Sequence, residues 1–328
     1  MSYSPSSGDQ ILSDAFRDTD LLWALLEQTD AGLYVVDTER RILYWNPGAA
    51  RISGYTAVDI TGRFCHGDLL MHCDGEGAGL CGTRCPLASV ITDGHPRDCM
   101  IYLRHKQGHR VPVRIRSRPI RDGHGQIIGA VEVFRPEGTA PRHAVLHGTA
   151  YGCCDEGTGL GNRAYGAMIV RQAIEALDRF ELPFGWVNFA LDKREELEHR
   201  HGKAFLDAAA TVMARTLEHC LGPLDVLLRW GPTEFRALAR CPGNRELLET
   251  ARKAVVLVRS SSVAWWGDSL RVRMSAGGVL AQRTDSLESL ELAATAAFEA
   301  SVAAGGNQAA IKHPGTIEFS SGNVVQIT

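Results

Sequence analysis

Apolar and polar residues in the first 136 positions follow the pattern of a small sheet with short helices. Near-helical spacing of apolar residues predicts a helix over residues 12–28. Five later stretches are short and rich in β-branched and aromatic residues, which predicts strands. These strands cover residues 32–37, 41–46, 99–105, 110–120 and 127–134. Two strands, short helices and three further strands indicate a small α+β domain.

The second half of the chain alternates helical and strand patterns. Helices are predicted over residues 162–180, 203–221, 246–258 and 287–304. Strands are predicted over residues 184–191, 226–229, 234–239 and 271–280. A polar turn at residues 230–233 joins the middle two strands into a hairpin. We therefore expect a second domain, a helix-covered mixed sheet of the α/β type, over residues 155–312.

Three segments lack a repeating pattern. Residues 1–19 are predicted to form a disordered or helical N-terminal segment, and residues 313–328 a C-terminal tail. Residues 137–154 contain proline and several glycines, which predicts a linker. No apolar run approaches the ~18–20 residues that cross a bilayer, and the N-terminus does not have the pattern of a secretory signal. We expect a cytoplasmic protein with no membrane partner.

Net charge and cysteine content limit the classes of function that the chain can have. The formal net charge of -3 argues against a nucleic-acid partner, which would require a basic surface to neutralise phosphates. Four of the nine cysteines crowd together at Cys65, Cys73, Cys81 and Cys85. In a reducing compartment such crowding indicates metal binding or redox chemistry rather than a disulfide framework. The alternative is that they are unliganded thiols, because single buried cysteines usually act as small apolar residues.

Two stretches of the first half resemble PAS domains. Residues 31–55 (AGLYVVDTERRILYWNPGAARISGY) resemble the opening strands and first helix of that fold, and residues 105–133 resemble its closing strands. The resemblance implies a sensor domain over residues 20–136. The resemblance does not identify a ligand, because PAS domains bind haem, flavin, metals, small metabolites or no ligand.

The cysteine-rich insert at residues 64–86 lies between these two stretches. It resembles a PAS variant of bacterial regulators that has a Cys, a downstream His and a final C-x-x-x-C-P-L. That resemblance implies Cys65, His72, Cys81 and Cys85 as a metal-binding set. His66 and Cys73 are less favoured ligands. Three thiolates and one imidazole suit zinc or an iron–sulfur cluster, and the thiols could alternatively form a reversible disulfide that senses redox state.

The second half is similar to the GGDEF family, whose active members condense two GTP molecules into cyclic di-GMP. Residues 155–163 (DEGTGLGNR), 201–207 (HGKAFLD) and 229–235 (RWGPTEF) match the family's motifs in order. Residues 275–277 (SAG) match the S-x-G sequence of a later strand in the family. The resemblance therefore covers residues 155–312.

Several positions that the family uses for catalysis carry other residues here. In the family two carboxylates bind the divalent metal, and the resemblance places Ala190 and Thr233 at those positions. Neither side chain replaces a carboxylate as a Mg²⁺ ligand. Pro232 takes the place of a glycine that lets the backbone approach the nucleotide. Ser301 and Gly306 align with cations that hold phosphates, so we expect no turnover of Mg-GTP.

The remnants of the nucleotide site are Asp192, Asp207 and Glu234. Glu198 takes the place of the asparagine that would read guanine, and the arginine of the family's inhibition motif is absent at residues 222–225. We expect a non-enzymatic signalling protein that forms a homodimer or docks on a protein partner. The alternatives are a receptor that binds GTP or cyclic di-GMP without turnover, and a diguanylate cyclase with residual activity.

Overall fold

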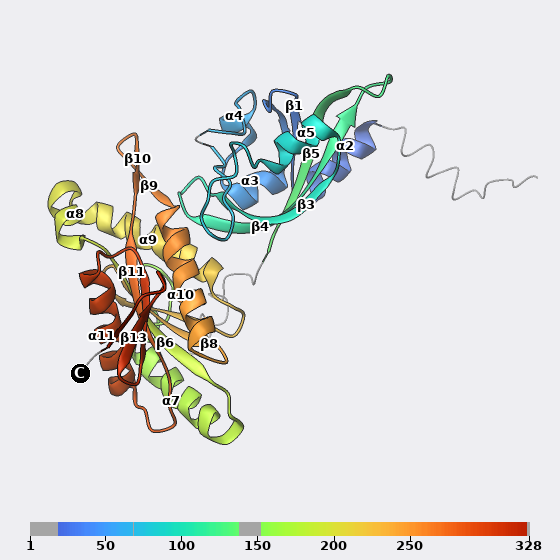
Figure 1. Cartoon of the computed structure of the whole chain (residues 1–328). Helices are drawn as coiled ribbons and strands as arrows, with labels where there is room; N and C mark the ends of the chain where they lie inside the picture. The colour runs from blue at the N-terminus through green and yellow to red at the C-terminus, as the bar shows by residue number, and fades with distance from the viewer. Residues whose placement is uncertain (1–18, 68, 138–151, 327–328) are drawn as a thin grey trace, which may run out of the picture. The chain divides into compact units, whose positions relative to one another are not determined.

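The computed structural model describes residues 19–67, 69–137 and 152–326 (Figure 1). It divides the chain into two compact units, one mainly before Glu137 and one mainly after Gly138. Residues 12–18 of the predicted first helix and residues 138–151 of the predicted linker lie outside the described residues. Among the described residues, none of the helices combines the length and the apolar character of a bilayer-spanning segment.

The N-terminal unit is built on a five-stranded antiparallel sheet with the strand order β2-β1-β5-β4-β3. Its strands are β1 (Gly32–Asp37), β2 (Ile42–Trp45), β3 (Arg97–Arg104), β4 (Arg110–Arg121) and β5 (Ile127–Pro136). Its helices are α2 (Thr19–Gln28), α3 (Pro47–Ser53), α4 (Ala57–Ile60) and α5 (Pro86–Asp93). The five predicted strands are all present, and their ends differ from the prediction by at most two residues.

The side chain of Asn46 joins three elements of this unit. Asn46 is fully buried, and its Oδ1 accepts hydrogen bonds from the Leu33 amide at 2.8 Å and the Ala49 amide at 2.7 Å. Its Nδ2 donates to the carbonyls of Leu26 and Ala31, both at 3.0 Å. The same residue therefore caps α3 and fixes the end of α2 and the start of β1.

The C-terminal unit is a seven-stranded mixed sheet with the order β14-β13-β12-β11-β6-β8-β7. Its strands are β6 (Phe184–Leu191), β7 (Val226–Gly231), β8 (Glu234–Arg240), β11 (Met274–Leu280), β12 (Ala309–His313), β13 (Thr316–Phe319) and β14 (Val324–Gln326). The helices are α7 (Arg163–Phe180), α8 (Arg194–His201), α9 (Lys203–Cys220), α10 (Asn244–Arg259) and α11 (Leu287–Ala303). Figure 1 shows α7 and α11 on one face of the sheet and α9 and α10 on the other.

Several features of this unit differ from the sequence prediction. The predicted strand at residues 271–280 is divided into β10 (Asp268–Arg271) and β11, and β10 pairs with β9 (Ser262–Trp265) in a separate hairpin. The hairpin turns at Trp266 and Gly267, which have positive φ angles of 51° and 90°, as in a type I′ turn. Tryptophan is an unusual residue for that turn, so the sequence did not signal it. The predicted tail contributes β13 and β14 to the sheet edge, and α8 was missed because it has no apolar face.

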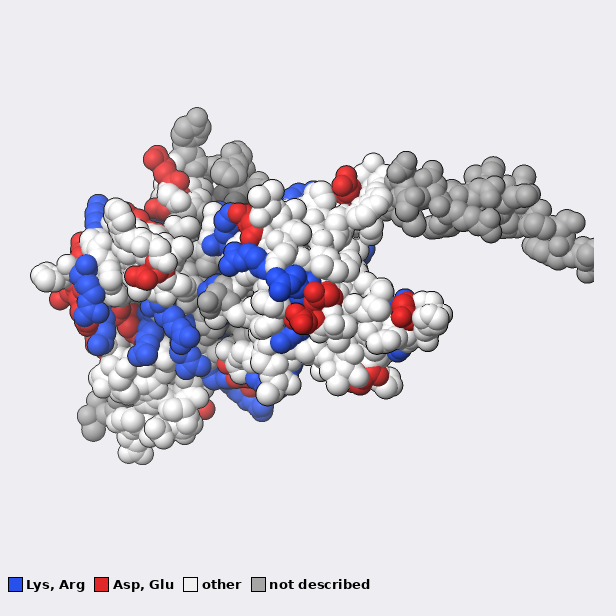
Figure 2. Space-filling view, turned by 90° about the horizontal axis from the view of Figure 1, so that it is seen from above, with Lys and Arg blue, Asp and Glu red and all other residues white. Residues whose placement is uncertain are grey.

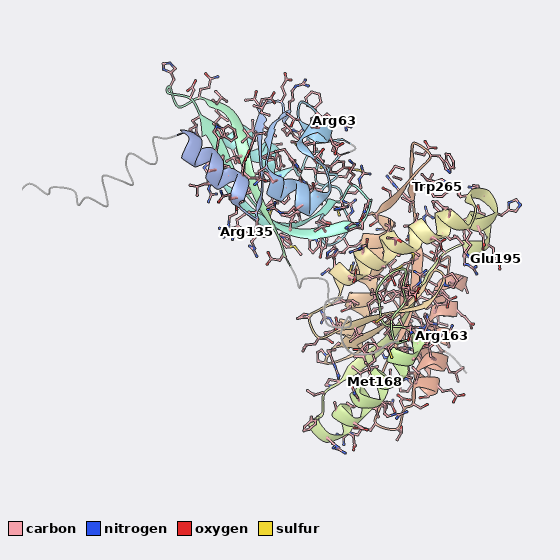
Figure 3. All side chains as sticks on the ribbon, turned by 180° about the vertical axis from the view of Figure 1, so that it is seen from behind. Arg63, Arg135, Arg163, Met168, Glu195 and Trp265 are labelled. Carbon is pink, nitrogen blue, oxygen red and sulfur yellow. The ribbon has the colours of Figure 1, made fainter. Side chains whose placement is uncertain are left out.

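Acidic and basic side chains are intermixed on the surface. Figure 2 shows Lys and Arg beside Asp and Glu on the face that it draws, in keeping with 35 basic and 38 acidic residues in the chain. Figure 3 shows Trp265 on the β9–β10 hairpin and Glu195 on α8, at the same end of the C-terminal unit. A candidate site opens at this end of the sheet.

Candidate functional site

A cleft of about 670 Å³ opens at the end of β6 in the C-terminal unit. Its walls come from the start of α8, the β7–β8 turn, the segment between β10 and β11, and the end of α11 with the loop that follows it. A volume of this size is in the range of small-molecule sites. The cleft contains most of the positions that the sequence analysis singled out in this half of the chain.

The two positions that would bind metal in the family lie in this cleft. Ala190, the last but one residue of β6, pairs with Ser275 on β11 and with Glu234 on β8. Thr233 in the β7–β8 turn is 1% exposed, and its carbonyl accepts a hydrogen bond from the Leu191 amide at 3.2 Å. The structure therefore places the two positions in one cleft, where they present a methyl group and a buried hydroxyl.

Asp192 is a remnant that serves as a structural anchor. Its Oδ1 accepts a hydrogen bond from the Ser275 hydroxyl at 2.6 Å, and its Oδ2 accepts one from the Asn307 amide at 2.8 Å. Burial raises the pKa of Asp192, while these two hydrogen bonds and nearby Arg273 act in the opposite direction. The carboxylate thus holds the loop after α11 against β6 and β11.

The two positions aligned with phosphate-binding cations do not offer side chains to the cleft. Ser301 is fully buried and donates a hydrogen bond from its hydroxyl to the Gln308 carbonyl at 2.8 Å. Gly306 has a positive φ of 68°, and a Cβ atom there would lie 3.1 Å from Oδ2 of Asp192. A side chain at position 306 would therefore have to displace the anchoring carboxylate.

The remaining predicted residues are dispersed around the cleft. Glu234 lines the cleft, 3.9 Å from the guanidinium of Arg236. Asp207 is exposed on α9 and does not line it. Pro232 lies in the β7–β8 turn, and its carbonyl accepts a hydrogen bond from Arg229.

Basic residues of the cleft are the functional feature that sequence reasoning missed. Four cations line it: Lys193, Arg194, Arg271 and Arg273. The sequence feature that could have indicated two of these cations is the pair of arginines on either side of a valine at residues 271–273 (RVR). Alternate residues of an extended segment point to the same side. The sequence did not indicate that the β9–β10 hairpin places this segment beside β6, at the cleft.

The cysteine-rich insert brings part of its predicted set together. Cys65, Cys85 and His72 are buried, and Cys81 is half-buried with its sulfur 3.2 Å from the His72 amide, which donates to it. Burial and, to a smaller extent, neighbouring Cys85 raise the pKa of Cys81 to about 11, although the hydrogen bond from the His72 amide opposes the rise. Burial also raises the pKa of Cys65 strongly, with Glu132 and Cys85 adding to the effect. Three thiols therefore lie within electrostatic range of one another.

The described residues nevertheless contain no group of three or more His, Cys, Asp or Glu side chains arranged to hold a metal ion. All nine cysteines are free thiols. The less favoured His66 has its ring 5.1 Å from that of Phe64, and burial lowers its pKa. The metal-binding set of Cys65, His72, Cys81 and Cys85 accordingly stays a prediction.

A buried carboxyl group beside these thiols was not anticipated. Glu132 on β5 is 1% exposed and accepts hydrogen bonds from the hydroxyls of Tyr34 and Ser117, each at 2.7 Å. Burial raises the pKa of Glu132, although both hydrogen bonds oppose the rise. Glu132 in turn raises the pKa values of Cys65 and Cys81. The N-terminal unit thus contains a cluster of thiols around an internal acid.

Comparison with known proteins agrees with both folds. A family model described as PAS fold matches residues 26–136, and a model described as diguanylate cyclase, GGDEF domain, matches residues 153–308. The chain contains a PAS domain followed by a GGDEF domain. The predicted fold class, an antiparallel PAS sheet followed by a helix-covered mixed sheet, is therefore confirmed. A search of curated proteins finds no match.

Solved structures similar to the chain include members of both families. The diguanylate cyclase SiaD in complex with its activator SiaC from Pseudomonas aeruginosa is 21% identical, with a TM-score of 0.47 over 49% of this chain and 62% of that chain. The FimX GGDEF domain from Pseudomonas aeruginosa is 18% identical, with a TM-score of 0.46 over 49% of this chain and 100% of that chain. A PAS domain from Colwellia psychrerythraea is 20% identical, with a TM-score of 0.32 over 36% of this chain and 95% of that chain. The chain thus spans less than two thirds of SiaD.

Proposed function

We propose that the chain is a non-enzymatic signalling protein. Its PAS domain senses redox state, a metal or a small ligand at the cysteine-rich insert. Its GGDEF domain relays that signal through dimerisation or binding of a protein partner, without synthesis of cyclic di-GMP.

The observation that carries the proposal is the composition of the GGDEF cleft. Joining two GTP molecules requires divalent metal to neutralise phosphate charge and to position the reacting groups. Mg²⁺ takes oxygen ligands, above all carboxylates, and neither Ala190 nor Thr233 supplies a carboxylate at the two metal positions. Asp192 could not move to the metal without releasing the Asn307 amide and the Ser275 hydroxyl.

A receptor for GTP or cyclic di-GMP is the second candidate, favoured by the open cleft. Two features weigh against recognition of guanine nucleotides. Glu198, at the guanine-reading position, lies 3.3 Å from the guanidinium of Arg194 in an ion pair. Ser301 directs its hydroxyl to a backbone carbonyl. We therefore rank this function below the relay.

For the PAS domain we propose the insert thiols as the sensing groups. Cys85 raises the pKa values of Cys65 and Cys81. Cys65 and Cys85 are buried, and Cys81 is half-buried. Zinc, an iron–sulfur cluster or reversible disulfide formation would each use such thiols. Elemental analysis and absorbance of anaerobically purified protein distinguish these three possibilities. Zinc in a colourless protein would support a zinc site, iron and sulfide in a brown protein would support a cluster, and the absence of metal would leave the reversible disulfide.

The cyclase question is tested by incubating the full chain with GTP and Mg²⁺ or Mn²⁺ and separating the nucleotides by chromatography. We expect unchanged GTP, whereas an active diguanylate cyclase assayed in parallel forms cyclic di-GMP. Formation of cyclic di-GMP or of its linear intermediate by this chain, at a rate above that of heat-denatured protein, would overturn the proposal.

A further inference from the structure

Strand β14 forms one outer edge of the seven-stranded GGDEF sheet. It pairs antiparallel with β13, and no strand in the part of the chain that the structure describes pairs with its other side. The outward-directed amides and carbonyls of an edge strand can form hydrogen bonds with a further strand. The outer side of β14 is therefore a site at which another strand can add to the sheet.

The sequence of β14 lacks the residues that usually protect a sheet edge from pairing. Proteins protect such edges with prolines, with bulges and with charged side chains, above all lysine. Residues 320–326 (SSGNVVQ) contain no proline and no charged residue, and β14 keeps a regular register with β13. Val324 is 60% exposed and Val325 is 49% exposed. Two β-branched apolar residues therefore lie at an open edge, where they favour strand pairing.

Strand β13 holds β14 against the domain core. Ile317 on β13 lies opposite Val325, is 3% exposed and packs with Phe319, Ala297 and Ala310. Residues that lie directly opposite in antiparallel strands share a face of the sheet. Val325 therefore continues the apolar face of Ile317 toward the edge, and a strand added there would cover it.

The other outer strand of the sheet, β7, is partly covered. The Arg229 amide on β7 donates a hydrogen bond to the Gly161 carbonyl at 2.8 Å, and Gly161 forms a parallel bridge with Leu228. The sheet thus has one edge that is open along its whole strand. A two-fold contact uses the same edge on both copies, so pairing through β14 stops at two chains.

We infer that a second copy of this chain adds its own β14 to this edge, which joins two GGDEF sheets across a two-fold axis. An uncharged edge suits an identical uncharged edge, because pairing opposes no like charges and leaves no charge without a partner. The axis must pass through one residue, since opposite residues point to the same face of the sheet. Full overlap of the two strands places Val325 opposite the same residue of the second copy.

This contact gives a surface to the dimerisation in the proposed function, on which the inference rests. The strand has three residues, so it adds few hydrogen bonds, and we expect a reversible dimer rather than a permanent one.

The test is analytical ultracentrifugation of the full chain over a series of concentrations. We expect a monomer–dimer equilibrium. Val325→Lys should weaken dimerisation about tenfold or more, because the axis brings two like charges together and an apolar contact is lost. Leu292→Lys on α11, at a residue that is 73% exposed, is the matched control and should dimerise like wild type. Both variants should keep the wild-type unfolding midpoint at dilutions where wild type is monomeric.

A cross-linking test gives a second readout that does not depend on loss of binding. In Val325→Cys the two new thiols would face each other across the axis, with about 4.5–5.5 Å between their Cβ atoms. Diamide takes up the two electrons and two protons that the thiols lose when they form a disulfide. We expect mass spectrometry to identify a disulfide between two copies of the substituted peptide. Leu292→Cys should give no such cross-link.

Three outcomes would overturn the inference: a chain that stays monomeric throughout the series, a Val325→Lys variant that dimerises like wild type, or no cross-link through position 325. Open-ended fibres of the wild type would also overturn it, because a two-fold contact closes at two copies. Cyclic di-GMP synthesis by a chain whose dimer depends on Val325 would overturn only the proposed function. Absence of synthesis with a dimer that Val325→Lys leaves intact would overturn only this inference.

Discussion

Substitutions of Glu132 in the PAS domain can separate two contributions to the free energy of unfolding: the cost of a buried charge and the cost of lost hydrogen bonds. The carboxyl group is 1% exposed and accepts hydrogen bonds from Tyr34 and Ser117 at 2.7 Å each. Glu132→Ala leaves two buried hydroxyls without an acceptor, at about 1–3 kcal/mol each, and removes packed atoms. We expect the free energy of unfolding of the PAS domain to fall by about 3–5 kcal/mol. Glu132→Gln keeps the shape and one acceptor oxygen, so its cost should stay below about 1.5 kcal/mol.

The pH dependence of stability has a definite sign. Because burial raises the pKa of Glu132 above its ordinary value of 4.5, the folded protein keeps this proton to a higher pH than the unfolded chain does. Between the two pKa values the folded state binds more protons, so the contribution of this group to stability falls as pH rises through that window. Glu132→Gln does not titrate and should lack this fall.

The assay is urea unfolding of the full chain at a series of pH values, read by hydrogen–deuterium exchange of peptides from β5, so that the PAS domain is followed separately. Glu39→Gln, at an exposed position, is the matched control and should follow wild type. If Glu132→Gln loses stability with pH as wild type does, or if Glu132→Ala costs less than about 1 kcal/mol, the reasoning about this carboxyl group is wrong.

Two further predictions concern residues that fix the fold around the sites. Asn46→Ala removes four hydrogen bonds, three of them buried, and should lower the unfolding free energy of the PAS domain by about 3 kcal/mol. Asp30→Ala, at an exposed side chain, should leave it unchanged in the same exchange assay. Ser301→Lys forces a charge into a fully buried site and should destabilise the GGDEF domain by about 3 kcal/mol or more in thermal unfolding. Val302→Lys, at a residue that lines the cleft and is 45% exposed, should be tolerated. Equal stability of these two lysine variants would contradict the burial argument.

Much of the candidate GGDEF site follows from residue identity. An alanine at position 190 and a threonine at position 233 cannot bind Mg²⁺ through carboxylates in any fold, so the sequence was sufficient for that conclusion. The role of Asp192 was not predictable in this way. Its partners Ser275 and Asn307 are distant in the chain, and only the pairing of β6 with β11 brings them to one carboxylate.

The sequence by itself determined most of the strands and helices and their order, because the spacing of apolar residues within an element is a local property. It missed α8, the β9–β10 hairpin and the strands at the sheet edge. It also predicted which residues occupy the positions that the family uses for catalysis. The tertiary structure decided which polar residues are buried and which cations share a cleft. The sequence around Glu132 has the pattern of an ordinary strand, and Arg271 and Arg273 precede an ordinary apolar strand, so neither burial nor a shared cleft could be predicted from it. Burial and electrostatic neighbourhood depend on segments far apart in the chain. The β9–β10 hairpin, which turns at an unexpected tryptophan, is the clearest case, because it sets the position of the arginines beside the cleft.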